Sequence, residues 1–334
     1  MSGDRSGIIC AGNWIVDLVH ELEQWPAESD LIRIGAQTRG VGGGAANVIM
    51  ALAKLETGLP LWPMGAVGDD DYGTFVLEAC RALGLPTTQL HAKAGVATAH
   101  THVMSVAGRS RTFFYQGGAN DMLSAADFPA GTFASTTARI FYLGYLTLLG
   151  TLDRLDARGM TDAARVLERA QKAGLRTCVD LVSVEHPAFQ PIVEAAAPFI
   201  DYLVLNEVEA ARATGAAVGA GTPDQADLAE MGRALLAQGV KGCVVIHSGE
   251  GAIWAGADGA MLHAPAKALP SEEIASHLGA GDAFCAGLLY ALHEGWAPDR
   301  VLALANATAR SSLKGVTATE AIPPLRSLDL VGAT

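Results

Sequence analysis

The pattern of apolar and polar positions predicts two kinds of structure in this chain. From about residue 138 onward, short apolar runs alternate with longer helical segments. An alternation of this kind indicates a parallel sheet covered by helices on both faces. We expect buried strands at 7–12, 61–67, 139–143, 177–181, 202–205, 242–247 and 252–255, and helices at about 48–55, 75–83, 159–173, 224–238, 282–293 and 298–313.

A second group of strands is too polar for a buried parallel sheet. These segments are 15–22, 31–38, 98–106 and 111–116, and polar side chains interrupt each of them. They predict a small separate sheet that could lie over a pocket as a lid. The chain shows no internal repeat and no long linker. We therefore expect one domain over residues 1–334, with a lid formed by segments of about 13–38 and 97–118.

Composition and charge narrow the classes of function. The 334 residues carry a formal net charge of −12 and no cluster of Lys and Arg, which argues against a nucleic-acid partner. The five cysteines are far apart and odd in number, as is typical of free thiols in a reducing compartment. We find neither a signal peptide nor an apolar run of membrane-spanning length. These features predict a cytoplasmic protein that acts on a small molecule.

The most informative motif is Gly279-Ala280-Gly281-Asp282, which precedes a long apolar helical segment. Glycine allows the backbone to turn tightly and to approach a ligand. The free N–H groups and the dipole of a helix N-terminus attract anions. An acid beside such a site suits phosphoryl transfer to an alcohol, with Asp282 as base and the amides stabilising charge. Alternatively, Asp282 only caps a core helix, and this motif alone leaves both interpretations open.

A second glycine-rich turn spans residues 40–44 and leads through Ala45-Ala46-Asn47 into another apolar helix. Residues 40–45 fit the pattern G-x-G-x-x-A of a dinucleotide-binding turn, as in an NAD-dependent dehydrogenase. The context argues against that function. The first predicted strand lies some 30 residues earlier, and no acid ends a strand about 20 residues later. Asn47 in the first helical turn is better suited to binding a hydroxyl, or simply to capping the helix.

Three polar residues lie at the ends of predicted parallel strands. Asp180, Asn206 and His247 each end or follow such a strand. Ligand sites in open α/β sheets form at the carboxyl ends of the strands, so we expect these side chains near a pocket. For His247, a histidine hydrogen-bonded at a strand end is an equally simple explanation.

Six motifs, in this order, resemble the ribokinase-like (PfkB-type) family of carbohydrate and nucleoside kinases over nearly the whole chain. They are Gly12-Asn13 with Asp17, Gly42 to Asn47, Gly68-Asp69-Asp70, Gly118-Ala119-Asn120, Asn206-Glu207-Val208-Glu209 and Gly279 to Phe284. The resemblance implies a three-layer α/β/α fold with a mostly parallel central sheet and a small β-sheet lid. It implies ATP-dependent phosphorylation of a hydroxyl, in particular a primary CH2OH, of a sugar, sugar-like acid or polyol. A nucleoside is the alternative acceptor.

The resemblance also assigns roles to residues. Asp282 corresponds to the catalytic base, and Gly279, Ala280 and Gly281 to the anion hole. The residues expected to bind the acceptor are Asn13, Asp17, Gly42, Gly43 and Asn47, together with Arg111 on the lid. The residues expected at the ATP and Mg2+ end are Asn206, Glu209, His247, Gly249, Gly251 and Asn306, with Glu209 reaching the metal through water. A non-catalytic sugar- or nucleoside-binding protein on the same fold would need neither Asp282 nor Glu209.

The sequence departs from the family pattern at three places. Ser276-His277 replace a common Asp-Thr pair whose acid belongs to a monovalent-cation site, so the need for such a cation is in doubt. Gly44 stands where ribose-specific members often have Lys. A Glu often used for sugar binding after the strand at 139–143 has no match, because Gly144-Tyr145-Leu146 occupy that place. Ribose is therefore not the first acceptor that we expect. An exposed lid sheet is also a surface through which two copies could form a homodimer.

Overall fold

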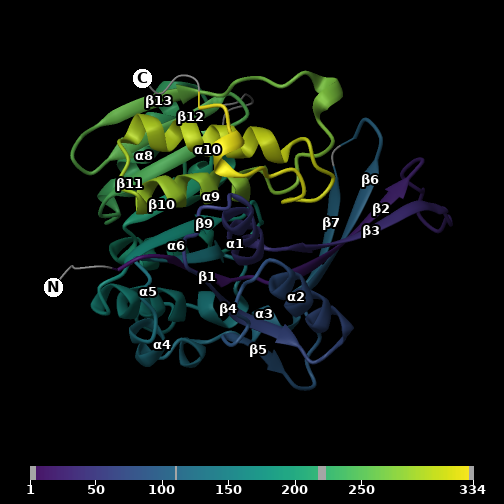
Figure 1. Cartoon of the computed structure of the whole chain (residues 1–334), viewed down its shortest axis with the longest axis horizontal. Coiled ribbons are helices and arrows are strands. Elements are labelled where there is room, and N and C mark those ends of the chain that lie inside the picture. Colours follow the sequence, from purple (N-terminus) through teal and green to yellow (C-terminus); the bar gives the residue numbers. More distant parts are fainter. Residues whose placement is uncertain (1–4, 110, 217–222, 331–334) are drawn as a thin grey trace.

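The computed structural model describes residues 5–109, 111–216 and 223–330. The described residues form a nine-stranded sheet covered by helices and a four-stranded sheet that projects from one end of it (Figure 1). These features confirm the predicted fold class. In the described part of the chain, no helix is both long enough and apolar enough to cross a bilayer.

The large sheet has the strand order β13-β12-β11-β10-β9-β8-β1-β4-β5. Neighbouring strands from β5 to β11 pair in parallel, whereas β12 and β13 are antiparallel. The inner strands are almost entirely apolar because helices cover both faces. The strands are β1 (Ile8–Gly12), β4 (Leu61–Gly68), β5 (Leu90–Lys93), β8 (Ile140–Leu146), β9 (Arg176–Leu181), β10 (Tyr202–Asn206), β11 (Cys243–Ser248), β12 (Gly251–Gly256) and β13 (Met261–Pro265).

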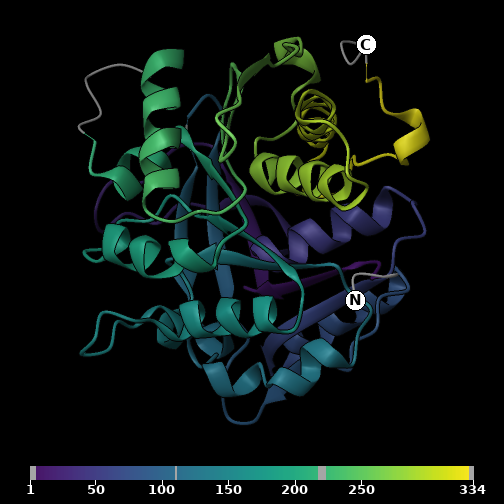
Figure 2. The ribbon, with the colours of Figure 1, turned by 90° about the vertical axis from the view of Figure 1, so that its left-hand side faces the viewer.

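Helices pack on both faces of this sheet (Figures 1 and 2). Successive residues of β8 enter different hydrophobic cores: Phe141 packs near Phe128 and Phe133, and Tyr142 packs in the core that contains Phe284. The helices are α1 (Gly44–Lys54), α2 (Asp71–Ala82), α3 (Gly118–Asp121), α4 (Ala130–Ala134), α5 (Asp162–Lys172), α6 (Phe189–Ala196), α7 (Glu207–Thr214), α8 (Gln225–Ala237), α9 (Ala280–His293) and α10 (Pro298–Ser312). All five cysteines are buried and unpaired.

The small sheet has the order β3-β2-β6-β7 and comprises β2 (Ile15–Leu22), β3 (Ile34–Gly42), β6 (His100–Val106) and β7 (Thr112–Gln116). Because β2 follows β1 after a break of two residues, the small sheet begins where β1, an inner strand of the large sheet, ends. Asp17 on β2 pairs in register with Gly40 of β3 and Thr101 of β6. This register places Asp17 and Thr101 on the same face of the small sheet.

Several predicted elements need correction. The strand expected at 31–38 is instead β3 (Ile34–Gly42), which runs directly into the glycine turn before α1. The strand expected at 252–255 is antiparallel to β11 because a tight turn, rather than a helix, joins the two. Strands β5 and β13 and helices α6 and α7 were not predicted from the hydrophobic pattern, because each is short. The turn at 40–45 follows a strand of the small sheet, so no βαβ dinucleotide-binding unit forms there.

Candidate active site

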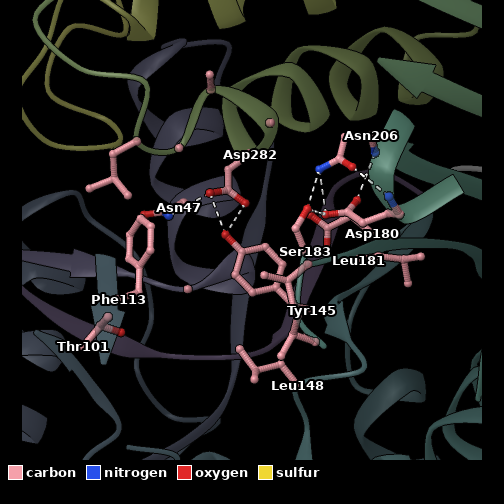
Figure 3. Close-up of a pocket in the computed structure, with 18 of the residues that line it drawn as sticks. Asn47, Thr101, Phe113, Tyr145, Leu148, Asp180, Leu181, Ser183, Asn206 and Asp282 are labelled. Atoms are coloured by element: carbon pink, nitrogen blue, oxygen red, sulfur yellow. Dashed lines mark hydrogen bonds between the residues drawn. The ribbon is translucent and has the colours of Figure 1, made fainter. Parts of the chain in front are cut away.

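A cleft of about 710 Å³ lies between the carboxyl ends of the parallel strands, the N-terminus of α9 and the small sheet. Figure 3 shows part of its lining, with Asp282 between Asn47 and Tyr145. The sequence-predicted residues that line this cleft are Asp17, Gly43, Asn47, Arg111, Asp180, Asn206, Glu209, His247, Gly279, Ala280, Gly281 and Asp282. The cleft therefore brings together residues from seven segments that are distant in the sequence.

Among the described residues, two of those predicted to bind the acceptor lie behind this lining. Asn13 is fully buried, and its side-chain amide donates to the carbonyl of Leu148 at 2.9 Å and accepts from the backbone N–H of Tyr145 at 2.7 Å. Asn13 thus fixes the segment that follows β8. Gly42 lies against the Asp17 carboxylate, since a Cβ at position 42 would come within 2.0 Å of Oδ2. Its role is to leave room for Asp17.

Three residues predicted at the nucleotide end also lie outside the lining of the cleft, as far as the structure describes it. Gly249 and Gly251 belong to the turn between β11 and β12 and to the start of β12. Asn306 lies on α10, where its amide donates to the carbonyl of Ala264 at 3.3 Å. The cleft does not reach these three positions.

Asp282 is the carboxyl group around which the cleft is built. It lies in the first turn of α9 and is only 5% exposed. The Asn47 amide donates to Oδ2 at 2.8 Å, and the Tyr145 hydroxyl lies 2.8 Å from both Oδ1 and Oδ2. Burial raises the pKa of Asp282 to about 7, although the hydrogen bonds from Asn47 and Tyr145 act in the opposite direction. Near neutral pH this group can therefore both accept and release a proton.

The backbone before Asp282 forms the candidate anion hole. Gly279 has a φ of 74°, and a Cβ there would lie 2.3 Å from the Cβ of Ala318, so position 279 requires glycine. The chain turns there into the 14-residue helix α9. The N–H groups of its first turn have no partner within the helix, and the helix dipole adds positive potential. Donors for a phosphoryl group thus lie directly beside the Asp282 carboxyl.

A hydrogen-bonded group at the start of α7 lies across the cleft. Asn206 and Glu209 form a capping box, with the Glu209 N–H donating to Asn206 Oδ1 at 2.9 Å and the Asn206 N–H to Glu209 Oε2 at 2.9 Å. The hydroxyl of Ser183 and the amide of Asn206 donate to Glu209 Oε1 at 2.9 and 2.8 Å. Burial raises the pKa of Glu209. Because the chain already occupies both carboxylate oxygens, these residues fit Mg2+ held through water better than direct coordination.

The carboxyl groups of the cleft outnumber its basic side chains. Burial raises the pKa of Asp17 to about 6, while the Thr101 side chain and the charge of Arg111 oppose this increase. Burial raises the pKa of Asp180 well above its usual value, and repulsion from Asp282 adds to the effect. Among the described residues that line the cleft, Arg111 is the only Lys or Arg.

Arg111 connects the small sheet to the loop that precedes the anion hole. Its guanidinium Nη1 donates to the hydroxyl oxygen of Ser276 at 2.8 Å. The backbone N–H of Leu278 donates to the same oxygen at 2.9 Å. A positive charge from the residue before β7 thus contacts the position where the family pattern commonly has an acid.

His247 lines the cleft as a neutral side chain. Burial lowers its pKa to about 4, and its ring centroid lies 5.0 Å from that of Phe284. A Cβ on Gly281 would come within 3.3 Å of the imidazole ring. These contacts are those of a packed strand-end histidine that supports the first turn of α9.

Tyr145 and Ser183 are two polar residues of the cleft to which the sequence assigns no role. Tyr145 lies near the carboxyl end of β8, and Ser183 follows the carboxyl end of β9. This position is the signal that could have identified them. The structure shows that the Tyr145 hydroxyl reaches Asp282.

Comparison with known proteins agrees with this fold. The sequence profile described as "pfkB family carbohydrate kinase" matches residues 5–324. The chain is 25% identical over 277 residues to a deoxyribokinase of Salmonella typhi, covering 83% of this chain and 82% of the relative.

Two solved structures have the same fold. A ribokinase of Arabidopsis thaliana, complexed with ribose and ATP, superposes with a TM-score of 0.79 at 22% identity, covering 97% of both chains. A nucleoside kinase of Burkholderia thailandensis, in complex with inosine, superposes with a TM-score of 0.73 at 19% identity, covering 96% of this chain and 94% of the other. At these identities the likeness concerns the fold alone.

Proposed function

The chain belongs to the pfkB family of carbohydrate kinases, and we propose that it transfers the terminal phosphoryl group of ATP to a primary hydroxyl of a sugar, sugar-like acid or polyol. One observation carries this proposal. The buried carboxyl of Asp282, with a pKa of about 7, lies beside the N-terminal amides of α9. A protein that only binds sugars needs neither a base at this position nor an anion hole next to it.

The proposed reaction follows from these two groups. Asp282 accepts the proton of the acceptor hydroxyl while the hydroxyl oxygen forms a bond to the γ-phosphorus and the bond from that phosphorus to the ADP oxygen breaks. The amides of Gly279, Ala280 and Gly281 donate to the negative charge on the moving phosphoryl group. When bound, Mg2+ supplies positive charge to the phosphates. Asn206 and Glu209 would hold its water ligands.

The acceptor end would be formed by Asp17 and Arg111. The carboxylate of Asp17 can accept hydrogen bonds from two neighbouring hydroxyl groups of a polyol chain. Arg111 has donors beyond the one that contacts Ser276, and a guanidinium can bind a carboxylate in a bidentate manner. Together they favour a polyhydroxylated acceptor, including one with an acid group. The small sheet that carries them would act as the lid.

A nucleoside is the second candidate for the acceptor, because aromatic side chains from β7 also line the cleft. Phe113 is 54% exposed and Tyr115 lies two residues further on. An exposed aromatic ring facing a cleft can stack on a nucleobase.

A screen of acceptors distinguishes the two candidates. We expect ATP-dependent phosphorylation of at least one sugar, sugar acid or polyol, measured as ADP release and confirmed by mass spectrometry of the product. Phosphorylation confined to nucleosides would select the second candidate. If no acceptor of either class is phosphorylated, the proposed function is wrong.

We expect Asp282→Asn to lower kcat by about 10²–10⁴ because the amide cannot accept the proton. The amide keeps the shape of the carboxyl group, so ATP affinity by calorimetry and the melting temperature should change little. Asp299→Asn is the matched control, since Asp299 lies exposed in the first turn of α10 and should leave turnover unchanged. Wild-type kcat in Asp282→Asn would identify Asp282 as a helix cap.

We expect Asp17→Ala to weaken acceptor binding by about tenfold to a hundredfold, as the loss of hydrogen bonds to a charged group predicts. ATP affinity should be unaffected, and calorimetry measures both. Glu21→Ala is the control, because Glu21 is an exposed acid further along the same strand that does not line the cleft. Loss of ATP affinity with unchanged acceptor affinity would mean that Asp17 lies at the ATP end of the cleft and would contradict this prediction.

Turnover should depend little on potassium, by less than about threefold between sodium, potassium and choline salts at equal ionic strength. Ser276 supplies no charge that would offset the dehydration of a cation, and the Arg111 guanidinium already contacts its hydroxyl. Initial rates in the three salts measure the effect. Potassium activation of about tenfold that saturates at millimolar concentration, well below the level of general screening, would contradict this expectation.

A further inference from the structure

We propose that Tyr145 is a positioning residue for the base: its hydroxyl orients the Asp282 carboxylate and keeps it in the form that accepts a proton. This inference rests on the proposed function of Asp282. It adds a residue from the segment Gly144-Tyr145-Leu146, which lacks the glutamate of the family pattern, and this residue has no role in the reaction as described above.

The contact between the two side chains involves both oxygens of the carboxyl group. The Tyr145 hydroxyl lies 2.8 Å from Oδ1 and 2.8 Å from Oδ2, and the Asn47 amide donates to Oδ2 at 2.8 Å (Figure 3). Two donors on different elements thus fix the plane of the carboxylate. Because the Tyr145 hydroxyl lies equally close to both oxygens, it faces the edge of the Asp282 carboxylate at which a proton would bind.

Tyr145 is itself held in place from two sides. Its backbone N–H donates to Oδ1 of the buried Asn13 at 2.7 Å. Its ring lies against the start of α1, where a Cβ on Gly44 would come within 2.8 Å of Cδ1 and 2.9 Å of Cε1. A side chain at position 44 would therefore displace the ring. The departures from the family pattern at positions 44 and 145 form one structural unit.

The electrostatic surroundings show why Asp282 needs these donors. Burial and repulsion from Asp17 and Glu209 raise the pKa of Asp282, whereas the hydrogen bonds from Asn47 and Tyr145 lower it. The other titratable or charged groups that interact with Asp282 or line the cleft are Asp180, Tyr142, Cys285, His247, His277, Tyr115, Glu185 and Arg111. Removal of a hydrogen-bond donor destabilises the charged carboxylate, and this raises the pKa of Asp282.

The test is the pH dependence of kcat/KM for the acceptor in Tyr145→Phe. Its acidic limb reports the base in the free enzyme. We expect this limb to move up by about one pH unit, as loss of a hydrogen bond to a charged group predicts. With a wild-type pKa of about 7 for Asp282, kcat/KM of the variant would be about fivefold below that of the wild type at pH 7. The difference would disappear by about pH 9.

Tyr142→Phe is the matched control. It removes a fully buried hydroxyl from the same strand, one that in the described structure makes no hydrogen bond to Asp282. We expect the acidic limb of its pH profile to move much less than that of Tyr145→Phe. A uniform loss of rate at every pH in Tyr145→Phe would mean that the hydroxyl does not act through the protonation of Asp282 and would overturn the proposal.

A measurement that does not depend on turnover separates this proposal from the proposed function. The 13Cγ resonance of Asp282, assigned by its loss in Asp282→Asn, should titrate at higher pH in Tyr145→Phe than in the wild type. An unchanged titration would overturn the proposal even if Asp282→Asn is inactive. If Asp282→Asn remains active, the proposed function fails, and an upward shift of this titration would still establish the contact. Should Tyr145→Phe not fold, Gly44→Ala, which crowds the ring, should shift the resonance in the same direction.

Discussion

The site depends on the burial of one carboxyl group, that of Asp282. Removing a carboxylate from water costs several kcal/mol unless protein donors replace the lost solvation. Here Asn47 on α1 and Tyr145 on β8 supply those donors, and the N-terminus of α9 contributes its dipole. The balance leaves the pKa of Asp282 at about 7. Three elements must therefore be assembled before this residue has the properties of a base.

The parallel sheet brings these elements together. Adjacent parallel strands lie about 4.8 Å apart, and four of them, β8 to β11, end along the same edge of the cleft. Tyr145, Asp180, Asn206 and His247 follow or end these strands in that order. The small sheet continues from β1 and returns Asp17 and Arg111 to the same opening. Acidic and hydroxyl-binding groups thus meet at one edge, while the cores on the two faces contain apolar side chains.

The environment of Tyr145 shows how departures from a family pattern can depend on one another. Read separately, Gly44 and Tyr145 are two substitutions that argue against ribose as the acceptor. In the structure, the absence of a Cβ at position 44 creates the space that the Tyr145 ring fills. Ser276 and Arg111 are related in the same way, because the hydroxyl of one accepts from the guanidinium of the other. In each pair, the two residues come from segments that are distant in the sequence.

Local pattern was sufficient to predict most of the fold. The apolar runs predicted the parallel strands. A strand buried on both faces is apolar along its whole length, whereas a surface strand alternates between apolar and polar residues. The turn at 279–282 also predicted where the amides and the carboxyl lie, since a helix N-terminus is a local structure. Short elements such as α6, α7, β5 and β13 lack enough periodic positions to be recognised. β12 is antiparallel to β11 because a tight turn joins the two strands. The direction of a strand within the sheet is a tertiary feature that the local sequence pattern does not show.

The sequence by itself determined the class of fold, the family and the acid beside the anion hole, because each is encoded in contiguous residues. Only the tertiary structure decided what those residues contact. It showed that Asn47 donates to Asp282, that Asn13 holds the backbone of Tyr145 behind the cleft, and that Tyr145 reaches the carboxyl group. Residues 13, 47, 145 and 282 lie far apart along the chain. Their contacts follow from strand order and helix packing, which no local pattern specifies.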